Sequence, residues 1–195
     1  MNKPLKIMVA STVYGFEDQL STICATLSNL KYEVINSQIG TVKVNPRKSN
    51  LENCLQAVHE CDTFLGIVRP FYGTGNIDET NITFEEMKLA IKLEKPYWFL
   101  VHRDVVFARQ LKKKMYYLND KGEKIREIRI EKSPVFDERT LDIYDFVIKE
   151  GKPISTRTGN WTQEFYRMDE ALVYVKAQFE DQEFIRYIIN SKKVE

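Results

Sequence analysis

Residues 81–101 read NITFEEMKLAIKLEKPYWFLV, and they combine a helical pattern with a strand pattern. In the first part, apolar residues recur three and four positions apart, a spacing that places them on one face of a helix. Residues 96–101, PYWFLV, then form a short apolar run that is typical of a buried strand. A helix joined directly to such a strand indicates the repeating unit of a parallel α/β sheet.

The same alternation extends back towards the start of the chain. Short apolar runs predict further strands at residues 5–10, 32–35 and 63–68. Between them, helical spacing predicts one helix after Phe16 and another after Ser49, where Ser49-x-x-Glu52 forms a capping-box pattern. We therefore expect an α/β fold whose parallel sheet is covered by helices on both faces.

The pattern changes after residue 102. Residues 105–118 predict a basic helix, residues 125–130 fit neither a helical nor a strand period, and residues 165–190 predict two short helices. We expect residues 1–102 to form the α/β domain. Residues 103–195 are expected to form a mainly helical C-terminal extension that packs on it.

Composition argues against several classes of function. The 195 residues include 29 basic and 28 acidic side chains, and the net charge of +1 argues against a nucleic-acid partner. No stretch approaches the roughly 20 apolar residues of a membrane span, and the N-terminal apolar run is too short for a signal peptide. Three cysteines without paired spacing and two histidines predict no metal site and a reduced, cytoplasmic protein.

Two adjacent acidic residues, Glu85 and Glu86, lie near the start of the quoted helix. Glu86 shares its helical face with Leu89 and Ala90, whereas Glu85 shares its face with Lys88. We therefore expect Glu86 to face the sheet and Glu85 to pair with lysine on the exposed side.

A second explanation of Glu86 requires no chemistry. Thr83-x-x-Glu86 is itself a capping-box pattern, and a carboxylate in the first turn is stabilised by the helix dipole. The residues alone leave both explanations open.

Three segments carry a resemblance to a known family: ASTVYGFEDQL, LENCLQAVHECDTFLGIVRPFYG and ITFEEMKLAIKLEKPYWFLV. Over residues 5–102 they resemble a TIR-like family of uncharacterised bacterial domains, within the wider group of TIR domains and nucleoside deoxyribosyltransferases. GNWTQEF, at residues 159–165, is similar to the tail of some members. The resemblance implies a flavodoxin-like (TIR-like) fold. In the wider group, a glutamate followed four residues later by alanine, and then by Lys-Pro and a strand, is catalytic, and this pattern maps onto Glu86.

The resemblance also implies cleavage of N-glycosidic bonds. The first expectation is an enzyme that cleaves NAD as its substrate, with no bound cofactor, and that releases nicotinamide, with an ADP-ribose-type signal in antiviral defence as the implied context. One alternative is a nucleoside or nucleotide deoxyribosyltransferase or N-glycosidase. Another is a non-catalytic module that binds a nucleotide or assembles with partners. A homo-oligomer and an effector protein partner are implied as well.

The binding residues should lie beyond the carboxyl ends of the strands, where ligands bind in parallel α/β sheets. The candidates at these ends are Ser11, Thr12, Tyr14, Arg69, Tyr72, Gly73 and His102. The first three suit ribose hydroxyls or a phosphate, although a polar turn explains them equally well.

Each of the remaining candidates also has a structural alternative. Arg69 suits a diphosphate or a surface ion pair. Tyr72 suits stacking against a base. His102 suits a proton carrier or a structural position. Asp62 is expected to cap the strand at residues 63–68 rather than to bind substrate.

Overall fold

The computed structural model describes residues 3–73, 81–127, 130–131, 133, 135–159 and 161–191. Its main sheet has five parallel strands in the order β2-β1-β3-β4-β7. The strands are β1 (Lys6–Ser11), β2 (Glu33–Ile35), β3 (Thr63–Val68), β4 (Tyr97–His102) and β7 (Thr162–Phe165). Four of them match strands predicted from the sequence, and the strand order is the flavodoxin-like one. The predicted fold class is confirmed.

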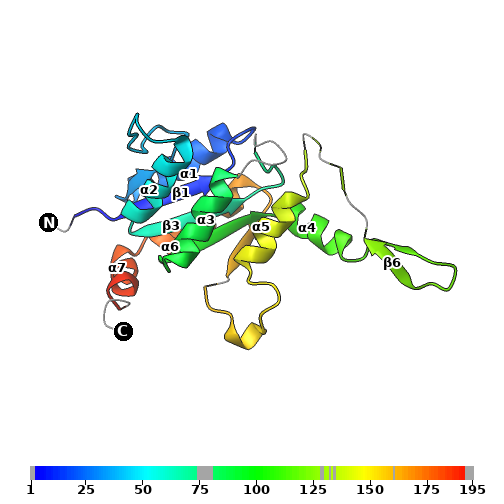
Figure 1. Ribbon diagram of the computed structural model, residues 1–195. Coiled ribbons are helices and arrows are strands. Elements are labelled where there is room, and N and C mark those ends of the chain that lie inside the picture. The colour runs from blue at the N-terminus through cyan, green and yellow to red at the C-terminus, as the bar shows by residue number, and fades with distance from the viewer. Residues whose placement is uncertain are drawn as a thin grey trace.

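Helices cover both faces of this sheet (Figure 1). One face carries α1 (Glu17–Asn29), α6 (Met168–Phe179) and α7 (Gln182–Ser191). The other carries α2 (Asn50–Glu60), α3 (Ile82–Lys92), α4 (Arg103–Lys112) and α5 (Arg139–Val147). Because successive residues of a strand point to opposite faces, Ile7 of β1 joins the first core and Met8 joins the second.

The predicted face of α2 is partly wrong. The sequence pattern used Leu51 and Leu55, but both are only half-buried, and the buried positions are Asn53, Cys54, Ala57 and Val58. Asn53 explains the difference, because its side chain binds the backbone of the preceding loop through Asn45, Lys48 and Ser49. A polar residue therefore occupies the buried face at the start of the helix.

The C-terminal extension contains strands as well as helices. β7 extends the main sheet beside β4, and β5 (Tyr116–Leu118) pairs with β6 (Lys124–Glu127) in an antiparallel hairpin. Figure 1 shows this hairpin standing away from the sheet. The helix predicted over residues 105–118 is too long, since α4 ends at Lys112 and aromatic residues, which favour strands, follow. The two helices predicted near the end are present as α6 and α7.

Residues 103–195 are mainly helical as expected, with α4, α5, α6 and α7, and the short strands are an addition that the sequence did not predict. The division at residue 102 stays a prediction, although β7 pairs with Phe99–His102 and so ties the extension into the sheet. Within the described part of the chain, no helix combines the length and the apolar character needed to cross a membrane.

Candidate active site

A cavity of about 540 Å³ lies beyond the carboxyl ends of β1 and β3, and we call it the Glu86 cavity. Its walls come from the loops after β1, β2 and β3 and from the first turns of α2 and α3. Six of the eight candidate site residues line it: Ser11, Thr12, Tyr14, Tyr72, Gly73 and Glu86. Its volume lies within the range of small-molecule sites.

Glu86 faces the interior and does not close the helix. The N-cap of α3 is Asn81, whose side-chain oxygen accepts the Phe84 N–H at 2.8 Å. The capping box suggested by Thr83-x-x-Glu86 is therefore not formed. Glu86 is only 5% exposed, while Glu85 forms an ion pair with Lys88 as its helical spacing predicted.

The surroundings of Glu86 change its acidity. Burial raises the pKa of Glu86 to about 7, because a carboxylate loses its hydration in the protein interior. The neighbouring Cys54 thiol acts in the opposite direction, since an S–H donor favours the charged form of Glu86. Burial, followed by the charge of Glu86, raises the pKa of Cys54 to about 12. At neutral pH the Cys54 thiol is therefore protonated. Glu86 is then present partly as the acid and partly as the carboxylate.

The loop after β1 forms one wall of the cavity. Ser11 and Thr12 are both buried, and the Thr12 hydroxyl donates to the carbonyl of Phe71 at 2.8 Å. The ring of Tyr14 stacks on Phe71 with the ring centroids 5.0 Å apart. The loops after β1 and β3 are thus joined by a hydrogen bond and a ring pair, and the Tyr14 side chain remains 63% exposed.

Tyr72 and Gly73, in the loop after β3, also line the cavity. The side-chain amide of Asn81 donates to the Tyr72 carbonyl, so the cap of α3 also holds the loop after β3. Arg139 lies over the Tyr72 ring, 4.0 Å from its centroid. Gly73 has a φ of +114°, a conformation that favours glycine, and a side chain there would approach Asn81 and Thr12.

Arg69 and His102 lie outside this lining. Both line a second cavity of about 420 Å³, which we call the His102 cavity. Arg69 Nη1 donates to the carbonyls of Thr12 at 2.8 Å and Tyr14 at 3.2 Å. Burial lowers the pKa of Arg69 to about 10, so it remains charged at neutral pH. Neither a diphosphate nor a surface ion pair is needed to explain its position.

His102 is the N-cap of α4. Its Nδ1 accepts the backbone N–H of Asp104 at 3.3 Å, and burial lowers the pKa of its ring. The Nδ1 acceptor role leaves the proton of the neutral ring on Nε2. The structure therefore separates His102 from the cavity that contains Glu86.

Most of the residues that line the Glu86 cavity were not among the sequence candidates for binding, and these include Asn50, Asn53, Cys54 and Asn81. Asn50 and Asn53 follow the Ser49 cap, so the capping pattern was the available signal for their place at the start of α2. The three cysteines are free thiols, and all three are buried. The contact of Cys54 with Glu86 joins two helices, and a single sequence carries no sign of it.

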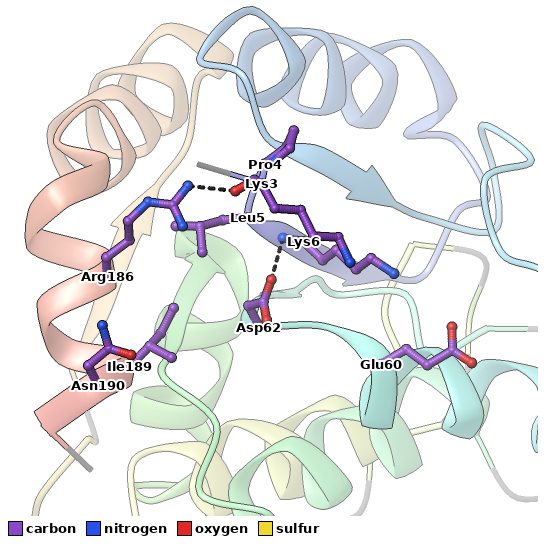
Figure 2. Close-up of a pocket in the computed structure, with 9 residues that line it drawn as sticks. All are labelled: Lys3, Pro4, Leu5, Lys6, Glu60, Asp62, Arg186, Ile189 and Asn190. Atoms are coloured by element: carbon purple, nitrogen blue, oxygen red, sulfur yellow. Dashed lines mark hydrogen bonds between the residues drawn. The ribbon is translucent and has the colours of Figure 1, made fainter. Parts of the chain in front are cut away.

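A third hollow, of about 420 Å³, lies at the opposite, amino end of the strands (Figure 2). Two of its polar side chains are bound within the protein: Asp62 accepts the Lys6 backbone N–H at 2.8 Å, and Arg186 donates to the Lys3 carbonyl at 2.8 Å. Asp62 thus links the start of β3 to β1, in agreement with a structural role. Across the described residues, no group of three or more His, Cys, Asp or Glu side chains is arranged to hold a metal ion.

Comparisons with known proteins place these features in a family. No curated protein matches the sequence significantly. One similar solved structure is that of the CMP N-glycosidase BcmB from Clostridium botulinum, with a TM-score of 0.47 and 14% sequence identity. The similarity covers 89% of this chain and 98% of that chain. The model of the family described as Domain of unknown function (DUF4062) matches residues 6–150, and the chain belongs to that family.

Proposed function

We propose that this protein cleaves an N-glycosidic bond of a nucleotide or nucleoside, with Glu86 as its catalytic carboxylate and NAD as the first candidate substrate. One observation carries the proposal: Glu86 is a buried carboxyl group at the wall of a ligand-sized cavity at the carboxyl end of a parallel sheet. Once ionised, a buried acid lowers the stability of the fold, and acids with pKa values perturbed in this way cluster at functional sites.

The chemistry requires little beyond a positioned carboxylate. As the bond from the anomeric carbon to the base breaks, positive charge develops on the ribose. A carboxylate beside that carbon stabilises the charge or attacks the carbon, and water then completes hydrolysis. With NAD, the leaving nicotinamide is already cationic and departs as a neutral molecule, so no proton donor is needed for it.

The raised pKa of Glu86 has a direct consequence for this mechanism. Glu86 must be ionised to stabilise the ribosyl cation, so its active form is the carboxylate. Since burial raises its pKa to about 7, kcat/KM should increase with pH through that region and level off above it. The Ser11 and Thr12 hydroxyls line the same wall and donate to the carbonyls of Thr12 and Phe71, so in this proposal they would meet sugar hydroxyls as acceptors.

A neutral nucleoside is the second candidate substrate. Of the described residues that line the Glu86 cavity, none is Lys, Arg or His, and most offer hydroxyl, amide or aromatic groups. Such a lining suits a sugar and a base without a phosphate. Deoxyribosyl transfer or nucleoside hydrolysis would use the same carboxylate.

The test is release of free base, followed by chromatography. The purified protein is incubated with NAD and, separately, with deoxynucleosides. Nicotinamide release that is lost in Glu86→Gln but retained in Glu85→Gln supports the first candidate, since Glu85 is the adjacent acid paired with Lys88. Base released only from deoxynucleosides supports the second. Binding of nucleotide without any release contradicts the enzymatic proposal and favours a non-catalytic module.

Several further expectations came from the sequence resemblance. Assignment to the TIR-like group, a role in antiviral defence, self-association and an effector protein partner all stay predictions. Residues 74–80, which connect Gly73 to Asn81 at the cavity, lie outside the described residues.

A further inference from the structure

The His102 cavity adjoins the Glu86 cavity. Tyr14 and Phe71 line both, so their stacked rings form a shared wall between the two spaces. At about 420 Å³, the His102 cavity is also within the size range of a ligand site. The two cavities open beyond the same end of the sheet, over the carboxyl ends of β1, β3 and β4.

The two linings differ in chemical character. Six aromatic rings line the His102 cavity: Tyr14, Phe16, Phe71, His102, Phe165 and Tyr166. Phe16 and Phe165 are buried and belong to the core, whereas Tyr14 and Tyr166 are 63% and 57% exposed. Exposed rings on the border of a concave aromatic site are typical of surfaces that stack a planar base.

Contacts already hold these rings in place. The His102 ring lies edge-on to Phe165 at 5.3 Å and is tilted to Tyr166 at 5.7 Å between centroids. On the other side, Arg69 binds the carbonyls of Thr12 and Tyr14 and lies over the Phe16 ring, 4.3 Å from its centroid. The site is therefore organised before any ligand arrives, which limits the entropy lost on binding.

We infer that the His102 cavity is a second subsite, which binds the aromatic base of the far nucleoside of a dinucleotide substrate while the Glu86 cavity holds the ribose that is cleaved. This inference rests on the proposed function and extends it, because it assigns the substrate to the dinucleotides, in which two nucleosides are joined by a linker. The charged Arg69 side chain, held at the loop between the cavities, favours an anionic linker near that wall.

The test measures binding and turnover separately. AMP represents the far half of such a substrate. It is titrated into Glu86→Gln protein, and its binding is measured by calorimetry. The double variant that adds Tyr166→Ala should bind AMP about ten-fold more weakly, since stacking on one aromatic ring contributes that much. Tyr187→Ala is the matched control, because Tyr187 is an exposed tyrosine on α7, outside this cavity.

Turnover provides the second measurement. On an otherwise unchanged protein, Tyr166→Ala should reduce the preference for NAD over nicotinamide riboside about ten-fold, because only NAD carries the far base. Failure of AMP to bind, or equal binding with and without Tyr166, overturns the inference. If AMP binding depends on Tyr166 but no substrate releases a base, the proposed function fails and the subsite stands as a nucleotide site.

Discussion

The two ends of the sheet each place an acidic side chain beside a hollow, and they use it differently. At the amino end, Asp62 accepts the backbone N–H of Lys6, and Arg186 donates to the carbonyl of Lys3 (Figure 2). At the carboxyl end, Glu86 is buried beside the Cys54 thiol, and its pKa is raised to about 7.

This difference shows that the size of a hollow does not by itself distinguish the two places. The two spaces differ only moderately in volume, at about 420 and 540 Å³. The two spaces differ in whether the acidic side chain accepts a hydrogen bond from the backbone of a neighbouring strand. Asp62 links two strands, whereas Glu86 lies at the wall of a cavity at the end of the sheet where α/β proteins bind ligands.

The sharpest way to break this comparison is to neutralise each acid. If the proposed function holds, Glu86→Gln should reduce base release by roughly 10³-fold or more, because the carboxylate that stabilises the ribosyl cation in that mechanism is lost. Asp62→Asn should release base at close to the rate of the unchanged protein, since its amide oxygen still accepts the Lys6 N–H. The rate of base release by both variants is measured by chromatography. A comparable loss of activity in Glu86→Gln and Asp62→Asn would contradict the different roles assigned to the two acids.

A second difference should be visible in stability. The folded-state pKa of Glu86, about 7, lies above its ordinary value of 4.5, so the folded protein binds this proton more tightly than the unfolded chain does. Glu86 therefore stabilises the fold fully below about pH 4.5, and this contribution is lost as pH rises through 7. Between pH 4.5 and 8, the free energy of unfolding of the unchanged protein should fall relative to Glu86→Gln by about 3 kcal/mol.

Urea unfolding at several pH values measures this effect. Thr83→Ser serves as control, because it alters another lining residue of the cavity without changing a titratable group. A constant difference between Glu86→Gln and the unchanged protein across the pH range would show that Glu86 does not have a raised pKa.

The smallest expected effect concerns the amino end. Asp62→Ala removes the acceptor of the Lys6 N–H and should lower the free energy of unfolding by about 1 kcal/mol. Glu85→Gln, which weakens only an ion pair with Lys88, should cost less than about 0.5 kcal/mol. Urea unfolding of both variants at neutral pH tests this order, and an equal cost would remove the structural role assigned to Asp62.

Sequence periodicity was sufficient where apolar residues repeat strongly. The apolar face shared by Glu86, Leu89 and Ala90 predicted the inward position of Glu86, and the structure confirms it. The strand at Thr162–Phe165 was missed because it lies at the edge of the sheet and buries only Phe165. An edge strand of polar residues has no periodic signal strong enough to detect.

The location of the candidate site could be predicted from the sequence. The separation of Arg69 and His102 from the other six candidates could not. The carboxyl-end rule brought together residues from the loops after β1, β3 and β4, and six of the eight do line one cavity. That rule cannot say which way each side chain turns within its loop. Arg69 is directed to the Thr12 and Tyr14 carbonyls, and its position depends on contacts between loops that are 55 residues or more apart in sequence.

The pairing of β7 with β4 bears on how the chain can be cut. A fragment that stops at residue 102 would leave the backbone of Phe99–His102 unpaired along an open border of the sheet. Such a border is a template for other chains, so the shortened protein should aggregate rather than fold as an independent unit. The region that carries Glu86 therefore depends, for its solubility, on a strand that begins 60 residues later in the sequence than β4 ends.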